Sequence, residues 1–480
     1  MRARATLILG SVLAVAGCAG HASTMRDVRA SLLRNDLEGA RARLAEAGRG
    51  TDDLLFALED GLLLYYAGDP ALSISRFDYA EGEVEERYTK SITRAALSLV
   101  TSDLILQFDP NGLDNLLVNY YKALAYIDLG DIDGAWVEWR RLESKLQFSR
   151  SSGDAAYLDP PFFSYLAGLG LEADDRNAAY IDYRLAEEAY RAAGIAPPRQ
   201  LVGDLLRLGT ELGFSEHLDL YRARYGALPG TTSGYGAGNG HGSEDRALAE
   251  VVVLVEDGLV APIEEVRAFI PITRERAKHV HDGGKVTHLD LAEALALEYR
   301  AGQYRDVSRG WANRVEIEYV LSIALPVFGK GRPALRRLTA TAASERVAAE
   351  PVLDVSALQR AAFEDRLLGI YAKTIARALV KYAAAAKLKD EAKGEDDDED
   401  GEESEGGEVV GVLANIVNAL TERADTRAWL GLPHRIWMAR LQLLPGTHEI
   451  KIDIDGIHEV SLGTVELTPG ERRFLSHRVF

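Results

Sequence analysis

The sequence is poor in several features that define common classes of protein. It contains one cysteine in 480 residues, which leaves no disulfide chemistry. After the first twenty residues no apolar run reaches the ~20 residues that span a bilayer, and no Gly-x-Ser-x-Gly elbow offers a serine nucleophile. Lys and Arg number 55 against 74 Asp and Glu, a net charge of −19 without an evident basic face. We therefore expect no nucleic-acid partner, because neutralising phosphates requires such a face.

The single cysteine lies at the end of a segment laid out like an export signal. Two arginines precede an uncharged, mostly apolar run from residue 5 to 16. The next stretch, Val15-Ala16-Gly17-Cys18, resembles the lipobox of bacterial lipoproteins. That resemblance implies removal of residues 1–17, cleavage between Gly17 and Cys18, and lipidation of Cys18. Acyl chains at ~0.8 kcal/mol per buried methylene would then hold Cys18 at a membrane.

The position after the cysteine bears on the destination. Ala19 stands where Asp would signal inner-membrane retention, so the lipobox resemblance implies anchoring at the outer membrane. We expect the body of the protein to lie in the cell envelope and to face the periplasm. An ordinary signal peptide with an incidental cysteine, or an uncleaved anchor, is the alternative.

Changes in composition divide the rest of the chain. Residues 18–225 have helical periodicity, and residues 226–246 form a Gly-rich linker. Residues 247–480 return to strand patterns, interrupted by a helical insertion at 357–422 that contains an acidic loop at 394–408. The predicted fold class is α+β, with a TPR-like α-helical superhelix followed by an antiparallel β-sandwich-like domain.

Helical hairpins repeat in the first half, with turns at Asn35-Asp36, Gly68-Asp69, Gly130-Asp131 and Asp174-Asp175. Small residues on paired helices would let them approach closely, and aromatic residues would fill the space beside them. This pattern resembles the tetratricopeptide (TPR) hairpin, although the spacing of the turns is irregular. The predicted packing and turn positions are Gly61, Gly68, Ala123, Tyr126, Gly130, Ala135 and Trp139.

Three further residues occupy positions where TPR hairpins line their concave surface: Tyr120, Leu124 and Ile127. They would grip a peptide segment of a partner if that surface is open. The alternative is that neighbouring elements bury them. The sequence alone leaves both open.

The second half contains several predicted strands and one long helix. The strands are 249–272 with a turn at Asp257-Gly258, 315–328, 333–343, 437–444, 447–454, 458–467 and 473–479. The helix covers 357–393, with a predicted buried stripe of Leu368, Tyr371, Ile375, Leu379 and Tyr382. Lys373, Arg377 and Lys381 are predicted to form its solvated outer face; the alternative is that they face anionic headgroups or the chain's own acidic loop.

Candidate ligand sites in the sequence are weak. His279, His281 and His288 contain a pair at strand spacing, but they match no established zinc pattern and lie in a Gly-rich stretch. The acidic run at 395–408 holds ten carboxylates. Aligned as an EF-hand loop, it places Gly407 where a bidentate Glu is required. We expect no metal site and no cofactor.

Several phrases, in the same order, are similar to an uncharacterised family of Gram-negative bacterial lipoproteins with a TPR-like helical N-terminal half and a β-rich C-terminal half. They include "LLVNYYKALAYIDLGDIDGAWVEWRRLESKLQ", "VVVLVEDGLVAPIEEVR" and "ADTRAWLGLPHRIWMARLQLLPGTHEI". The resemblance implies no enzymatic activity and a role in maintaining the outer membrane or peptidoglycan. The long acidic run departs from the family.

Two functional hypotheses follow. The first is a non-enzymatic, lipid-anchored envelope scaffold that binds protein partners through its helices and contacts membrane and peptidoglycan. The second is a hydrolase of peptidoglycan or another glycan that uses paired carboxylates in the C-terminal domain. A cleft with two acids ~5 to 9 Å apart would favour the second hypothesis.

Overall fold

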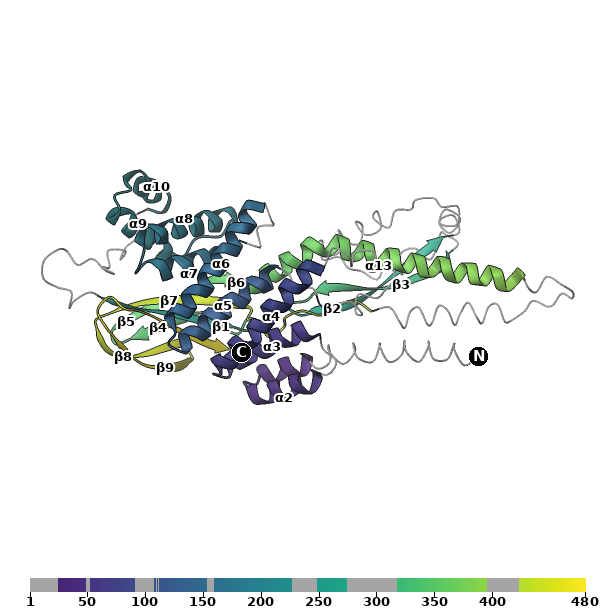
Figure 1. The fold of residues 1–480 in the computed structure, drawn as a ribbon, viewed down its shortest axis with the longest axis horizontal. Coiled ribbons are helices and arrows are strands. Elements are labelled where there is room, and N and C mark those ends of the chain that lie inside the picture. The colour runs from purple at the N-terminus through teal and green to yellow at the C-terminus, as the bar shows by residue number, and fades with distance from the viewer. Residues whose placement is uncertain are drawn as a thin grey trace.

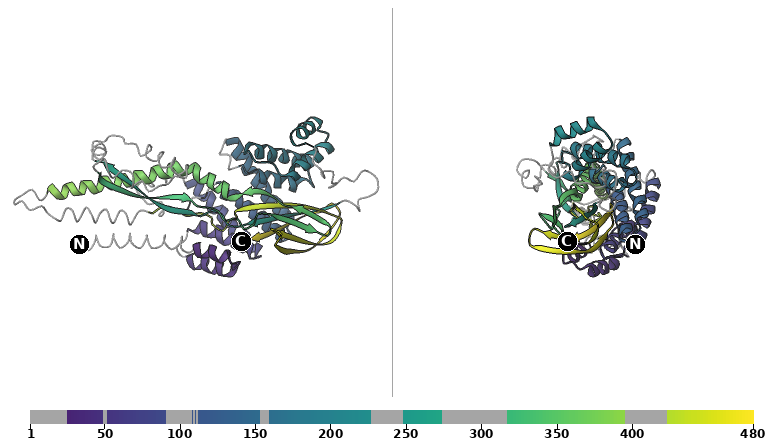
Figure 2. Two further views of the ribbon diagram at one scale, coloured as in Figure 1. Left: turned by 180° about the vertical axis from the view of Figure 1, so that it is seen from behind. Right: turned by 90° about the vertical axis from the view of Figure 1, so that its left-hand side faces the viewer.

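The chain folds into a layer of helices packed against a β-sandwich, from which an arm projects (Figure 1). The computed structural model describes residues 25–48, 52–90, 108, 110, 112–152, 159–226, 248–273, 317–394 and 423–480. Helices fill the first half and sheets the second, which confirms the predicted α+β class. Viewed along the long axis, the helices lie on one side of the sheets (Figure 2).

The helical layer is a series of antiparallel hairpins, each helix packed on the next. The helix of residues 25–32 precedes α2 (Leu37–Ala47), α3 (Asp53–Tyr66), α4 (Pro70–Lys90), α5 (Gly112–Asp128), α6 (Ile132–Ser152), α7 (Pro161–Leu171), α8 (Arg176–Ala192), α9 (Arg199–Glu211) and α10 (Ser215–Tyr225). All four predicted turns separate helices. A fifth hairpin, α9–α10, was missed because Phe214 follows Gly213 in its turn, where each of the other four turns has an aspartate.

Local chemistry starts and ends these helices. The side chains of Asp36, Asp52 and Asp175 accept hydrogen bonds from backbone N–H groups of the first turns of α2, α3 and α8. Gly68 and Gly130 have φ of 77° and 75°, a left-handed conformation that glycine adopts without steric cost. The hairpins therefore follow from short-range signals in the sequence.

The strands form two four-stranded sheets and a two-stranded ribbon. The first sheet has the order β10-β1-β7-β6 and the second β5-β4-β8-β9. β1 pairs antiparallel with β7 and parallel with β10, whereas the other pairs are antiparallel. The strands are β1 (Ala249–Asp257), β4 (Leu338–Ala342), β5 (Glu345–Ala348), β6 (Glu350–Asp354), β7 (Arg435–Leu443), β8 (Gly446–Ile454), β9 (His458–Leu467) and β10 (Arg472–Val479).

One strand, β1, is buried along its whole length. Val251, Val253 and Val255 face the second sheet in the core of the sandwich. Val252 and Leu254 face the helices and share a core with residues of α3 to α9. The helical region and the β-rich region, which the sequence divides at the linker, are therefore joined by one continuous core.

The segment 423–434 adds a second connection between the two regions. Glu59 of α3 accepts hydrogen bonds from the N–H groups of Leu430 and Gly431 at 2.5 and 3.0 Å. Arg29 donates to the carbonyl oxygens of Leu430 and Val260. Burial raises the pKa of the Glu59 carboxyl to about 8, although both N–H groups favour its charged form.

The projecting arm consists of the ribbon β2 (Ile263–Thr273) and β3 (Ile317–Phe328) packed on α13 (Val355–Gly394). The buried stripe of α13 includes Phe363, Leu367, Tyr371, Ile375 and Ala378. The prediction was wrong for Leu368, which is 38% exposed, because the stripe is shifted by one residue there. It was also wrong for Arg377, which is 4% exposed, because the buried face is wide enough to include Thr374 and Arg377.

The shared core predicts that the helices and the sandwich unfold together. Phe474 of β10 packs against Trp139 of α6, with ring centroids 5.2 Å apart. Phe474→Ala should lower the free energy of unfolding by ~3–5 kcal/mol. In guanidinium titrations, far-UV circular dichroism and tryptophan fluorescence should give coincident transitions for the wild type and the variant. Phe148→Ala is the matched control, because Phe148 is 67% exposed. Separate helix and sheet transitions would contradict the shared core.

Candidate functional site

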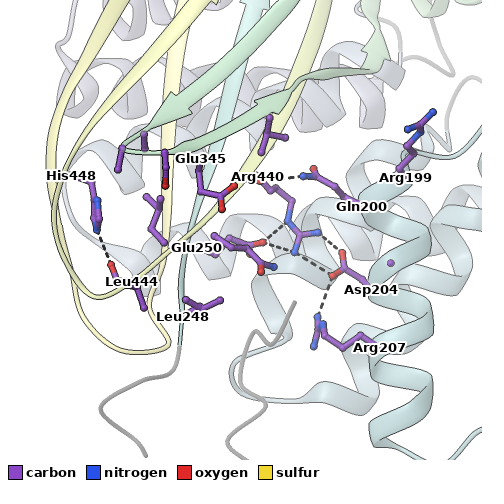
Figure 3. A pocket seen from close by; sticks show the side chains of 17 residues that line it. Arg199, Gln200, Asp204, Arg207, Leu248, Glu250, Glu345, Arg440, Leu444 and His448 are labelled. Carbon is purple, nitrogen blue, oxygen red and sulfur yellow. Dashed lines mark hydrogen bonds and ion pairs between the residues drawn. The ribbon is translucent and has the colours of Figure 1, made fainter. Parts of the chain in front are cut away.

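A crevice of about 570 Å³ opens between α9 and one end of the sandwich (Figure 3). Helix α9 forms one wall, and the β4–β5 turn forms the opposite wall. The start of β1 and the end of β7 form the floor. The lining residues are Arg199, Gln200, Gly203, Asp204, Arg207, Leu248, Glu250, Ala342, Ala343, Ser344, Glu345, Val347, Arg440, Gln442, Leu443, Leu444 and His448.

The floor is organised around the guanidinium group of Arg440 on β7. Its Nε donates to Glu250 Oε1 of β1 at 2.7 Å, and its Nη1 donates to the Tyr165 hydroxyl of α7 at 2.6 Å. Both Nη atoms also contact the Asp204 carboxylate of α9. One buried arginine thus links two helices to two strands.

The network continues through two more arginines. Arg472 of β10 binds Glu250 Oε2 at 2.5 Å and Glu172 Oε2 at 3.2 Å. Arg207 of α9 binds Glu172 Oε1 at 2.5 Å and Asp204 Oδ1 at 3.2 Å. Charge pairs therefore form a closed ring beneath the crevice. Three guanidinium groups balance three carboxylates.

The arginines favour the ionised forms of Asp204 and Glu250. Burial alone would raise the pKa of Asp204, but Arg440 and Arg207 lower it below its usual value. Burial would likewise raise the pKa of Glu250, which Arg440 and Arg472 lower. In the folded protein the pKa values of Asp204 and Glu250 lie below those of the unfolded chain. Their ion pairs therefore stabilise the folded state near neutral pH. This stabilisation is lost as the pH falls through the folded values.

The crevice carries further polar and charged groups besides this network. Arg199 is exposed on the first turn of α9, and its backbone N–H binds Glu350 Oε2 at 2.9 Å. The Gln442 side-chain oxygen is buried and has no hydrogen-bond partner among the described residues. His448 contacts the Leu444 carbonyl oxygen at 2.7 Å. The crevice can therefore bind a ligand that supplies hydrogen-bond donors and negative charge.

The residues considered for a concave groove lie in the interior. Tyr120 and Leu124 are buried, and Ile127 is half-buried against the shared core. The first sheet occupies the surface that an open TPR superhelix would offer to a peptide. Of the two alternatives for these three residues, burial by neighbouring elements is the one that the structure shows.

Tyr120 belongs to a buried polar cluster around Glu256 of β1. Tyr65 and Tyr66 of α3, Tyr120 and Tyr121 of α5, and Arg478 of β10 surround the Glu256 carboxyl group. Glu256 is 2% exposed, and the hydroxyl groups of Tyr66, Tyr120 and Tyr121 lie near enough to its carboxylate to favour the charged form. Burial raises the pKa of Glu256 to about 7, although Arg478 opposes that shift.

The predicted packing residues lie at contacts within the helical hairpins. A Cβ atom at Gly61 would lie 3.0 Å from the Phe77 ring, so a larger residue there would require Phe77 to shift where α3 and α4 approach closely. Ala123 and Ala135 are buried on α5 and α6. Of the four remaining predicted residues, Gly68 and Gly130 lie in turns. Tyr126 is half-buried beside Gly134, and Trp139 packs on β10.

Other predicted positions lie outside the described residues. These are Gly17 and Cys18 of the signal segment, the three histidines His279, His281 and His288, and the acidic loop. Within the described part of the chain, no three His, Cys, Asp or Glu side chains are grouped to hold a metal ion. In that same part, no helix has the length and apolar content needed to cross a membrane.

Sequence analysis missed the network of Arg440, Asp204 and Glu250. A signal was present, because Glu250 and Arg440 each interrupt an apolar strand, in "AEVVVLVED" and "RIWMARLQL". A charge within a buried strand requires a partner of opposite sign. The identity of that partner depends on the register of β1 and β7, which the sequence does not reveal.

Comparisons with known proteins do not identify this chain. No protein-family model matches it, and no curated protein matches its sequence. Among solved structures, the apo form of RapI matches with a TM-score of 0.30 and 13% identity. That match covers 40% of this chain and 49% of RapI, about half its length. A similarity this low supports no conclusion about fold or function.

The ion-pair network predicts a large effect of removing its central cation. Arg440→Met would leave Asp204 and Glu250 as incompletely paired buried carboxylates, so the free energy of unfolding should fall by ~3–5 kcal/mol. The control is Arg473→Met, because Arg473 is exposed and pairs with Glu471 at the surface; this change should cost below about 1 kcal/mol. Urea titrations measure both. Equal losses would contradict the role of Arg440.

The Glu256 cluster predicts that stability falls as pH rises. The folded pKa of about 7 lies above the usual value near 4.5, so between these values the folded state binds more protons. This contribution to stability is lost as pH rises from about 4.5 through 7, and it amounts to ~3 kcal/mol. Glu256→Gln should flatten the unfolding free energy across this window. The control is Glu216→Gln, at an exposed site on α10, which should leave the pH dependence of the unfolding free energy as in the wild type. If Glu256→Gln also leaves that pH dependence unchanged, the assignment of the pKa to Glu256 is wrong.

Proposed function

We propose that this protein is a non-catalytic, lipid-anchored scaffold of the cell envelope that binds a protein partner. Its helices and sandwich act as one body because they share a core. The helices use their inner surface to hold the first sheet. Partner binding is therefore assigned to the crevice between α9 and the sandwich.

The state of the acids in the crevice carries the non-catalytic part of this proposal. Asp204 and Glu250 bind the same guanidinium group, and the pKa of each is lowered by neighbouring arginines despite burial. A glycoside hydrolase needs one protonated carboxyl group to protonate the leaving oxygen. Two carboxylates held ionised do not supply that proton. The crevice thus supports binding better than it supports hydrolysis of a glycan.

The lipid anchor and the position of the body form the second part of the proposal. If Cys18 carries the acyl chains, the short segment from Cys18 to Met25 reaches at most about 25 Å in extended form. The helix of residues 25–32 would then lie close to the membrane surface. With such an anchor, the proposed binding crevice would belong to a body that stays within reach of the bilayer.

A labelling experiment tests the anchor. In cells grown with radioactive palmitate, the wild-type chain should be labelled and should sediment with membranes, whereas Cys18→Ser should lose both properties. Ser23→Ala is the control and should behave as the wild type. Label that persists in Cys18→Ser would show that the anchor assignment is wrong.

The scaffold role needs a separate test. Crosslinking in intact cells followed by mass spectrometry should recover a reproducible protein partner with the wild-type chain. Purified full-length chain should release no soluble fragments from peptidoglycan. Release of fragments, or the absence of any reproducible crosslinked protein, would contradict the scaffold role.

A further inference from the structure

The end of β7 has an unpaired edge in the part of the chain that the structure describes. β1 pairs with all of β7, from Arg435 to Leu443. On the other side of β7, β6 pairs only with residues 435–438. Among the described strands, residues 439–443 therefore have a hydrogen-bonded strand on one side only.

The crossing of the chain between the two sheets explains this gap. β6 begins at Glu350, and the preceding strand β5 belongs to the second sheet. Ala349, between them, donates its N–H to the carbonyl oxygen of Leu338 on β4, which also belongs to the second sheet. The chain thus leaves the line of β6 opposite Met438. Among the described strands, none is hydrogen-bonded to the rest of β7 on this side.

Two observations show which backbone groups face this edge. The Arg440 carbonyl oxygen accepts a hydrogen bond from Gln200 Nε2 of α9 at 3.2 Å, so the main-chain groups of Arg440 point away from β1. Independently, Glu250 donates its N–H to the Glu471 carbonyl oxygen, on the β10 side of β1. Glu250 is opposite Gln442, so this is a non-hydrogen-bonded pair. The N–H and C=O of Gln442 therefore also face the unpaired edge.

The crevice lies along this edge. Arg440, Gln442 and Leu443 line its floor, with α9 on one side and the β4–β5 turn on the other (Figure 3). Its volume of about 570 Å³ lies within the range of binding pockets in proteins. The buried side-chain oxygen of Gln442 adds an acceptor without a partner among the described residues.

We propose that the crevice binds an extended peptide segment of a partner protein, which adds as a strand to the β7 edge at Arg440 and Gln442. In this binding mode main-chain hydrogen bonds give affinity, and alternate side chains give specificity. Side chains that face α9 meet the exposed Arg199, whereas the network beneath is already neutral. The peptide therefore carries an acidic side chain at such a position. This inference rests on the proposed scaffold function and names its binding mode.

The test selects peptides on the full-length chain and then maps where they bind. A phage library of random 12-residue peptides is selected on the immobilised protein, and the enriched peptides are synthesised. Fluorescence anisotropy measures their affinity, and hydrogen–deuterium exchange measures amide protection. Enriched peptides should carry an acidic residue and should slow exchange in residues 439–443.

Two matched pairs of variants locate the binding. Gly203→Leu places a side chain in the crevice from α9, and it should weaken peptide binding at least tenfold. Gly82→Leu, on α4 where an added Cβ meets nothing within 4 Å, should not. Arg199→Glu should weaken acidic peptides, whereas Arg222→Glu on the exposed side of α10 should not. The melting temperature of each variant checks that it folds.

Several outcomes overturn strand addition: no enriched peptide, peptides unaffected by both Gly203→Leu and Arg199→Glu, or protection confined to other elements. The scaffold role fails separately. If in-cell crosslinking still recovers the same partner with Gly203→Leu, the scaffold stands and the β7 edge is not its binding site. If no partner is recovered even with the wild type, the scaffold itself is wrong.

Discussion

The rest of the structure depends on the burial of β1 on both of its faces. A strand in this position must satisfy two cores at once, and alternate valines achieve this for most of its length. On the face toward the helices the exceptions are Glu250 and Glu256, which place two carboxyl groups against the helical layer. Burying a charge without a partner costs several kcal/mol. At Glu250 two arginines compensate this cost, whereas at Glu256 burial raises the pKa until the neutral form competes near pH 7.

The sequence predicts those structural features that depend on residues close together in the chain, and it fails where the interacting residues are far apart in the chain. The hairpin turns were predictable because Gly68 and Gly130 act locally, and β9 was placed at its exact bounds by period-two alternation and flanking turns. The short strands β5 and β6 escaped notice, since four- and five-residue strands around Ala349 give little pattern. The burial of Tyr120 was left undecided because it results from a sheet more than a hundred residues away. The floor of the crevice was missed for the same reason, since it needs the register that places Glu250 beside Arg440.

Because the first sheet packs against the helices through β1, the concave surface of the helical layer is not available to a partner. A TPR-like array normally offers that surface to partners, but here the chain's own sheet occupies it and aromatic residues such as Trp139 and Phe474 close the contact. Binding capacity remains where the layers end and their main chains stop pairing, at the crevice beside α9. The ion-pair ring beneath it holds α7, α9, β1, β7 and β10 in fixed relation. A site on such a rigid frame loses little conformational entropy when a ligand binds.

Comparison of the β7 edge with the edge strand β9 explains why the β7 edge suits selective binding. Long, flat edges invite indiscriminate pairing, and proteins prevent it with bulges, charges and short lengths. β9, at the edge of the second sheet, has a register shift opposite Ile450–Lys451, a positive φ of 97° at Gly463, and the charged Glu459 paired with Lys451. These features protect it. The β7 edge is protected differently, because it is short and recessed between α9 and the β4–β5 turn. A large flat sheet cannot enter such a recess, whereas a single extended segment can, so its shape favours one strand over an aggregate.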